Sequence, residues 1–191
     1  MSQDVYLRCY CPVTIAFYPL LEDVRKDFPM KKNIVVVICI LVLVGLFFYS
    51  RDVKVNADIS SYGDITIEIV GLTENSFTIT PNMLADLSCV QQTVTGTSAK
   101  VGTVTAVGPL LDTFLAQYDR KQSDFTKIRI SAGDGYKIVL KSEMLKGKII
   151  LSVASGNEPL DEKFQPLRII VPDAASSYWS YQVNRIEFVT D

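Results

Sequence analysis

The longest apolar stretch of the chain, IVVVICILVLVGLFFY, covers residues 34–49 and contains no charged residue. As a helix with a rise of about 1.5 Å per residue it would extend roughly 24 Å, which is close to the span of a bilayer core. Basic residues are denser before this stretch than after it, which places the N-terminus in the cytoplasm. We therefore expect a transmembrane signal-anchor over residues 34–50, in contact with membrane lipid through Ile34–Tyr49.

This anchor predicts a single-pass protein of the cell membrane with a cytoplasmic tail over residues 1–33 and an extracytoplasmic C-terminal domain. No small-residue cleavage pattern follows the apolar run, which favours an anchor over a removed signal peptide. A buried core helix is the other alternative. The segment MKKNIVVVIC from Met30 is typical of the start of an exported protein, so residues 1–29 are interpreted as a short tail or as an extension before the true start.

Residues 51–63 are polar without a clear period and predict a tether. From residue 64 onward the pattern becomes that of a folded domain over 64–191. DITIEIV alternates apolar and polar residues, as a half-buried strand does. Two short helices are expected, one behind Thr80 and Pro81 and one behind Pro109, because a capping side chain and proline both favour a helix start.

Further β-rich runs follow in the second half of the domain. FTKIRISA and YKIVL are joined by Gly133-Asp134-Gly135, which predicts a tight turn between two strands. KGKIILSVA, LRIIV and NRIEFV predict additional strands. Strands outnumber helices and no regular alternation of strand and helix appears. The expected fold is α+β, with a mixed or antiparallel layered sheet and short helices.

Composition and charge argue against several classes of function. The 191 residues are 48% hydrophobic and 21% charged, as in a globular protein. The net charge of −2, without clustered Lys and Arg, argues against nucleic-acid binding. Histidine is absent, which removes the commonest general base and the usual nitrogen ligand of zinc. The glycine-rich segments lack the lysine and the spacing of nucleotide-binding loops.

One loop has the composition of a binding site. Gly96, Thr97, Ser98 and Ala99 lie between the β-rich runs VQQTVTGT and GTVTAV, so small side chains would let a ligand approach the backbone. The loop contains no cysteine, histidine or carboxylate. Cys89 is the only cysteine after the apolar run.

An ordered set of motifs gives a resemblance over about Ile65–Asp191. The segments, in order, are GLTENSFTITPNMLADL, GPLLDTFL, ISAGDGYKIVLKSEML, GNEPLDEKFQPLRIIVP and YWSYQVNRIEFV. Together they resemble the molybdopterin-binding domain of sulfite-oxidase-type oxidoreductases. The resemblance implies that family's layered sheet and a pterin cofactor whose molybdenum is bound by a cysteine thiolate in the loop after the strand VQQTVTGT.

The chain departs from the family pattern at the cofactor. The loop expected to hold the thiolate reads Gly96-Thr97-Ser98, and Cys89 precedes the strand instead of following it. The family's basic residues for the pterin phosphate are absent from PDAASSYWSYQVN, where Tyr178 and Tyr181 stand instead. We interpret the domain as non-catalytic, with no cofactor and no bound metal expected.

The former cofactor cleft is then the candidate binding surface. Its candidate residues are Gly96, Thr97, Ser98, Tyr178, Trp179 and Tyr181, with a protein partner at the extracytoplasmic face; ordinary core packing is the alternative for the three aromatics. Two other functions stay open. One is an active molybdopterin-dependent oxidoreductase ligated through Ser98 or Cys89, and the other is an anchored solute-binding or sensing domain.

Overall fold

The computed structural model describes residues 53–190, which belong to one compact unit, Arg51–Asp191. The expected cytoplasmic tail and signal-anchor lie outside the described residues, as does residue 191. Within residues 53–190, no helix is both long and apolar enough to cross a membrane.

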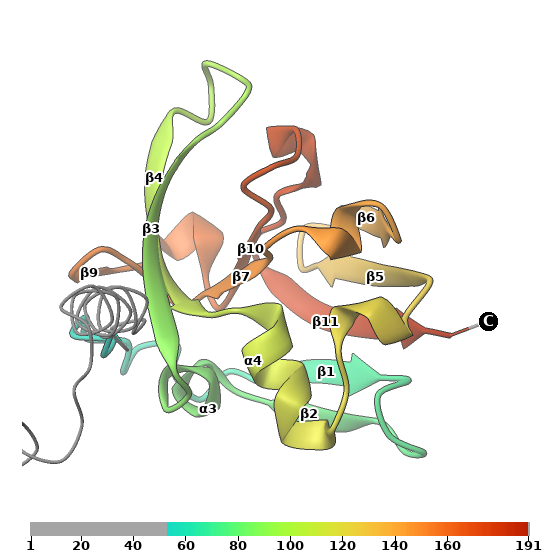
Figure 1. Cartoon of the computed structure of the whole chain (residues 1–191). Coiled ribbons are helices and arrows are strands. Elements are labelled where there is room, and N and C mark those ends of the chain that lie inside the picture. The colour runs from blue at the N-terminus through green and yellow to red at the C-terminus, as the bar shows by residue number, and fades with distance from the viewer. Residues whose placement is uncertain (1–52, 191) are drawn as a thin grey trace, which may run out of the picture. The chain divides into compact units, whose positions relative to one another are not determined.

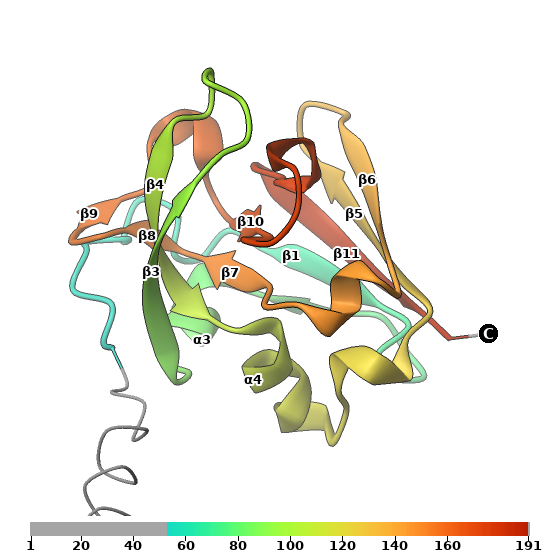
Figure 2. The ribbon, with the colours of Figure 1, turned by 45° about the horizontal axis from the view of Figure 1, so that its top comes forward.

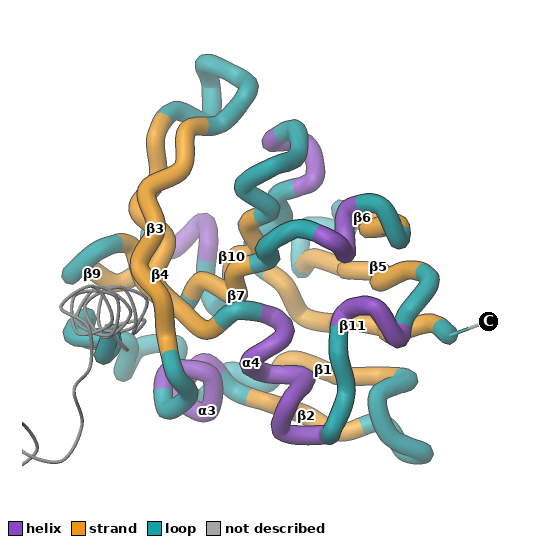
Figure 3. The backbone as a smooth tube through the Cα atoms, viewed as in Figure 1, coloured by secondary structure: helices purple, strands orange, loops and turns teal. Residues whose placement is uncertain are grey.

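Short strands and shorter helices make up this unit (Figure 1; Figure 3 colours them by type). The strands are β1 (Ile67–Val70), β2 (Phe77–Ile79), β3 (Cys89–Thr95), β4 (Thr103–Pro109), β5 (Lys127–Ala132), β6 (Lys137–Lys141), β7 (Ile150–Ser152), β8 (Ala154–Ser155), β9 (Glu158–Pro159), β10 (Arg168–Ile170) and β11 (Val183–Val189). The helices are α3 (Pro81–Ala85) and α4 (Leu111–Leu115), with 3₁₀ turns η1 (Ala116–Tyr118), η2 (Gln122–Asp124), η3 (Met144–Lys146), η4 (Glu162–Phe164) and η5 (Ser176–Tyr178). The expected α+β class is confirmed.

The strands form three sheets. A five-stranded sheet has the order β2-β1-β11-β5-β6, in which β1 and β11 are parallel and the other neighbours antiparallel. A four-stranded antiparallel sheet has the order β3-β4-β8-β9, and β7 pairs with β10. Gly108 of β4 lies so close to the carbonyl of Leu151 in β7 that a Cβ there would clash, which allows the two strands to pack directly.

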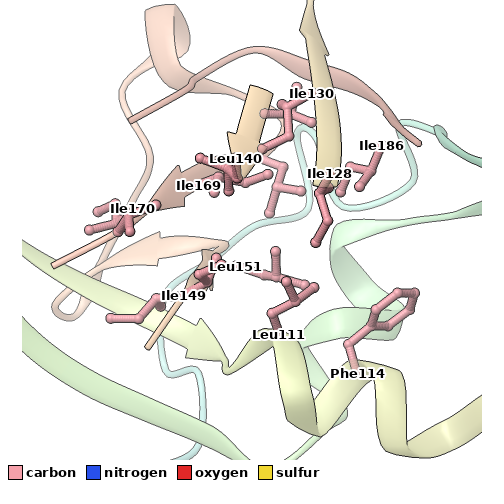
Figure 4. Close-up of a cluster of buried hydrophobic side chains, with 14 of the residues drawn as sticks. Leu111, Phe114, Ile128, Ile130, Leu140, Ile149, Leu151, Ile169, Ile170 and Ile186 are labelled. Atoms are coloured by element: carbon pink, nitrogen blue, oxygen red, sulfur yellow. The ribbon is translucent and has the colours of Figure 1, made fainter. Parts of the chain in front are cut away.

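Alternating apolar residues of the five-stranded sheet supply one face of the core. Ile128 and Ile130 of β5 and Ile186 of β11 are at most 1% exposed. Figure 4 shows them near Leu111 of α4 and Leu151 of β7. Each buried side chain of this size stabilises the fold by about 1.5–3 kcal/mol. The apolar residues that alternate along these strands therefore hold the sheet against the rest of the core.

Local signals explain the start of α3. Thr80 is its N-cap: the Thr80 side chain accepts a hydrogen bond from the Met83 N–H at 3.3 Å, and Pro81 takes the first helical position. Both features were expected from the sequence. The helix ends after five residues, at Ala85, so it contributes little beyond Pro81 and Leu84 to the core.

Residues 53–63 differ from the expected tether because they pack on the domain. Val53 forms an antiparallel bridge with Cys89 of β3. Ile59 and Tyr62 are buried with Leu160 in a cluster of their own. The Tyr62 hydroxyl donates to the Val153 carbonyl at 2.7 Å and accepts from the Leu160 N–H at 2.9 Å. A polar-looking segment is therefore fixed by its few apolar residues and one buried hydroxyl.

Candidate functional site

The loop of small residues Gly96, Thr97, Ser98 and Ala99 is the tip of the β3–β4 hairpin. The Gly96 N–H donates to the Gly102 carbonyl at 2.8 Å, which closes the tip, and the Val101 N–H donates to the Ser98 carbonyl at 3.0 Å. Ser98 also accepts a bond at its Oγ from the Lys100 N–H at 3.3 Å. The tip is thus an ordered turn with its own internal hydrogen bonds.

The hairpin tip is bound to η5, which lies beside it in both Figure 1 and Figure 2. The Thr97 Oγ1 and Ser176 Oγ atoms are 3.1 Å apart, and the Ser176 N–H donates to Thr97 Oγ1 at 3.0 Å. The Ser98 N–H donates to Ser176 Oγ at 3.3 Å. We call these three bonds the tip contact (Thr97, Ser98 and Ser176). It joins segments 78 and 79 residues apart in sequence.

A second hairpin reaches the same short helix. The Tyr136 hydroxyl, at the β5–β6 turn, donates to the Ser177 carbonyl at 2.8 Å. This turn is shaped by Asp134, whose Oδ1 accepts from the Tyr136 N–H at 2.9 Å, and by Gly135 with φ of +86°. Of the two glycines expected to accept positive φ, only Gly135 does so. Helix η5 therefore bridges hairpins from two different sheets.

The structure brings together only part of the predicted site. Thr97 and Ser98 contact η5 directly, and Tyr178 belongs to that helix and is half-buried. Trp179, by contrast, is 4% exposed, and its Nε1 donates to the Val171 carbonyl at 2.9 Å, so it is a core residue. Tyr181 stacks edge-on against Phe164, with ring centroids 5.5 Å apart. Trp179 is therefore a core-packing residue. Tyr178 lies in η5 and Tyr181 lies against Phe164, so the three aromatic side chains do not form one surface.

Arg168 is a buried cation that sequence reasoning overlooked. It is 6% exposed, and its guanidinium carbon lies 4.5 Å from the ring centroid of Phe164 and 5.7 Å from that of Trp179. Its Nε has no hydrogen-bond partner among residues 53–190. Burial lowers the pKa of Arg168, and the nearby Tyr181 and Asp161 partly oppose this. The only sequence signal was a single basic residue in an otherwise apolar strand.

The residues at the hairpin tip do not fit a molybdenum pterin. A soft, redox-active metal needs a thiolate, and the tip offers only hydroxyls: Thr97 Oγ1 is paired with Ser176, and Ser98 Oγ accepts from the Lys100 N–H. Cys89 is buried at the opposite end of β3, where it is paired with Pro109, about 20 Å along the strand from the tip. Within the described part of the chain, no group of three or more His, Cys, Asp or Glu could hold a metal.

A surface hollow of about 540 Å³ lies away from the tip. Its lining comes from residues 53–55 and 85–88, next to the Cys89 end of β3. One carboxylate, Asp86, and one amine, Lys54, contribute to it. A single carboxylate does not make a metal-ligand set, and the hollow lies next to the end of β3 opposite the tip, so it adds no ligand to the tip.

A solved structure shares the fold. The sulfane dehydrogenase SoxCD from Paracoccus pantotrophus, a molybdopterin enzyme, superposes with a TM-score of 0.55 at 18% sequence identity. The match covers 68% of this chain but 39% of the SoxCD chain. No protein-family model matches the chain, and no curated protein matches its sequence. The likeness supports the expected molybdopterin-binding fold, and it extends to the fold alone.

Proposed function

We propose that this chain is a membrane-tethered, non-catalytic protein whose domain keeps a molybdopterin-binding fold and acts as a binding module outside the cell membrane. The tip contact carries the proposal. Where the resemblance implies a metal-binding thiolate, Thr97 Oγ1 bonds to Ser176, the Ser98 N–H donates to Ser176 Oγ, and Ser98 Oγ accepts from the Lys100 N–H. Hydroxyls occupied in this way supply neither a soft metal ligand nor a nucleophile activated by a base.

The lack of basic residues in the segment after β10 supports the same proposal. A pterin phosphate removed from water requires compensating positive charge. The segment between Arg168 and Arg185 contains no basic residue. Arg168 itself is enclosed by the Phe164 and Trp179 rings. The loss of thiolate and of phosphate partners together favours a role in binding over one in redox chemistry.

Molybdenum content tests the non-catalytic part of the proposal. The full chain, and the chain from residue 51 onward, would be produced in a host that makes the pterin cofactor and analysed for molybdenum and released pterin. A molybdenum enzyme of the sulfane dehydrogenase type, made in the same host, is the control for cofactor supply. We expect no metal in either form of this chain while the control is loaded.

Near-stoichiometric molybdenum would contradict the proposal and favour the alternative of an active oxidoreductase. Two variants would then identify the ligand. Ser98→Ala removes the hydroxyl at the tip, and Cys89→Ala removes the thiol at the far end of β3. Loss of metal in one variant alone assigns the ligand, because the two atoms lie at opposite ends of the strand.

The membrane part of the proposal is supported by the sequence of Ile34–Tyr49 and by the basic residues before it. It is tested by extracting cell membranes at alkaline pH and by adding protease to intact cells. We expect the full chain to stay in the membrane pellet and residues 51–191 to be digested from outside. Release at alkaline pH would contradict an anchor, and protection from protease would contradict the orientation.

A further inference from the structure

Strand β3 forms one outer edge of the four-stranded sheet, whose order is β3-β4-β8-β9 (Figure 2). It is seven residues long and pairs with β4 along its whole length. On its other side, Val53 forms the one β-bridge found among residues 53–190, at Cys89. The rest of that side is a row of backbone groups with no neighbouring strand among residues 53–190.

Hydrogen bonds already present fix which groups face outward. The Val53 N–H donates to the Cys89 carbonyl at 3.0 Å, so Cys89 points away from β4. The Gly96 N–H donates to Gly102 within the hairpin, so Gly96 points toward β4. Because the direction alternates along a strand, Gln91, Thr93 and Thr95 direct both N–H and C=O outward. In the described part of the chain these groups have no backbone partner.

The other edges of the two larger sheets are protected against pairing, and this one is not. Strand β6 has Lys137 and Lys141 at its ends, β9 is two residues long and contains Pro159, and β2 is three residues long. Lysine, proline and shortness are the usual means of blocking an edge. The sequence CVQQTVT of β3 has no charge and no proline. An unblocked edge of this length is suited to adding another strand.

We propose that β3 pairs antiparallel with β3 of a second copy of this chain, about a two-fold axis at Thr93. In an interface with two-fold symmetry the same patch meets itself, so a charge near the axis would face a like charge. The absence of charge along β3 therefore fits a copy of itself. A different partner protein would impose no such requirement.

The register follows from the outward groups. An axis at Thr93 places Thr93 opposite its own copy and Gln91 opposite Thr95, so all three outward residues form hydrogen-bonded pairs. Cys89 keeps its bond to Val53. An axis at Gln92 would instead bring Thr95 against Cys89, whose carbonyl is already bonded to Val53. In the first register strand pairing stops at Gln91, because β3 of the second copy ends at Thr95, so all three outward residues are used and Val53 keeps its place beside Cys89.

Side chains on the exposed face continue across this axis. Thr93 Oγ1 lies 3.0 Å from Thr105 Oγ1, and Thr95 Oγ1 lies 3.2 Å from Thr103 Oγ1. These threonine pairs already link β3 to β4. In the paired form Thr93 meets Thr93 of the second copy, so the row of hydroxyls runs through four strands. This surface goes beyond the proposed function and depends neither on the anchor nor on the absence of metal.

Disulfide cross-linking of the full chain tests the pairing. Thr93→Cys would be introduced with Cys9, Cys11 and Cys39 replaced by serine, and the protein oxidised. Residues in a hydrogen-bonded antiparallel pair have Cα atoms about 5.5 Å apart, which lies within disulfide reach. We expect Thr93→Cys to form a covalent dimer.

Thr105→Cys is the matched control, because Thr105 bonds to Thr93 on the same face but lies one strand further inward. Its two copies would be separated by three strand spacings, about 14 Å, and beyond disulfide reach. We expect at least about ten times less dimer than with Thr93→Cys, with both variants keeping the melting temperature of the parent chain.

The register has its own test. Gln91→Cys and Thr95→Cys, carrying different tags, should cross-link with each other when co-produced and far less with themselves. Equal self-linking of each variant would overturn the register. In a separate measurement, Thr93→Lys should reduce the dimer fraction of the full chain about tenfold at a fixed concentration, and Thr105→Lys should leave it unchanged.

Three results would overturn the proposal. The first is a Thr93→Cys thiol that reacts with maleimide but gives no covalent dimer. The second is equal cross-linking of Thr93→Cys and Thr105→Cys, as random collision would produce. The third is a Thr93→Cys cross-link to a different protein, which would make β3 the docking edge for a foreign strand.

Discussion

Two groups of residues that both contact Phe164 of η4 bury a polar side chain in different ways: the cluster of Ile59, Tyr62 and Leu160, and Arg168 with Trp179. In one, Tyr62 bonds through its hydroxyl to the buried backbone of Val153 and Leu160. In the other, Arg168 lies against aromatic rings, and its Nε has no hydrogen-bond partner in the described part of the chain. Phe164 packs against both clusters. A buried polar group that completes hydrogen bonds is needed by the fold, whereas one that does not complete them costs free energy.

The comparison predicts that the Tyr62 hydroxyl matters most. Tyr62→Phe keeps the ring but leaves the Val153 carbonyl and the Leu160 N–H without their partner. Each lost buried bond costs about 1–3 kcal/mol, so we expect the free energy of unfolding to fall by about 3 kcal/mol. Urea unfolding followed by circular dichroism measures it. A loss below about 1 kcal/mol would show that water replaces the hydroxyl, and the contrast with Arg168 would disappear.

Arg168 should contribute through its packing and not through hydrogen bonds, in contrast to Tyr62. Two substitutions separate the effect of its charge on stability from the effect of its packing. Arg168→Ala removes the aliphatic stem between the rings and should cost about 2 kcal/mol. Arg168→Met fills the same space without the buried charge, so its free energy of unfolding should lie within about 1 kcal/mol of the parent or above it. Both are measured by the same urea titration. If Arg168→Met is as destabilising as Arg168→Ala, the guanidinium itself has a partner that stabilises the fold.

Sequence reasoning succeeds for elements that depend on local patterns and fails for Tyr62, whose contacts are distant in the chain. Alternation of apolar residues predicted β1, the Gly133-Asp134-Gly135 turn predicted the β5–β6 hairpin, and Thr80 with Pro81 predicted the start of α3, because all three depend on neighbours in the chain. Tyr62 was assigned to a tether because its partners lie 91 and 98 residues away. Its burial depends on tertiary contacts with distant residues, which a local sequence pattern does not reveal.

The candidate site was predictable to a similar degree. The small residues of the hairpin tip were identified from composition, and their proximity to η5 was expected only through the resemblance. Ser176, which completes the tip contact, was missed because an exposed-looking serine carries no signal of its own. Trp179 was grouped with Tyr178 and Tyr181 by sequence position, but its Nε1 bonds to the Val171 carbonyl in the core, whereas Tyr181 is 40% exposed and lies against Phe164.

The tip contact is expected to contribute less to stability than the Tyr62 bonds or the packing of Arg168, because its hydrogen bonds are only partly buried. Thr97→Val keeps the shape of the side chain and removes Oγ1, which leaves the Ser176 N–H without its acceptor. We expect a loss of about 1 kcal/mol and faster hydrogen exchange at the Ser176 amide. Thr95→Val is the matched control, since its hydroxyl bonds to the exposed Thr103 instead. Equal exchange rates at Ser176 in the two variants would mean that the tip contact does not hold η5.

The smallest effect is expected where a tyrosine hydroxyl bonds at the surface. Tyr136 is 45% exposed, and its hydroxyl donates to the Ser177 carbonyl at 2.8 Å. In Tyr136→Phe, water replaces the lost donor, so the free energy of unfolding should change by less than about 0.5 kcal/mol. The substitution is chemically identical to Tyr62→Phe, so the two losses compare a buried hydroxyl that makes two hydrogen bonds with an exposed one that makes one. A loss at Tyr136 as large as that at Tyr62 would show that η5 depends on the β5–β6 turn as strongly as the N-terminal segment depends on its buried hydroxyl.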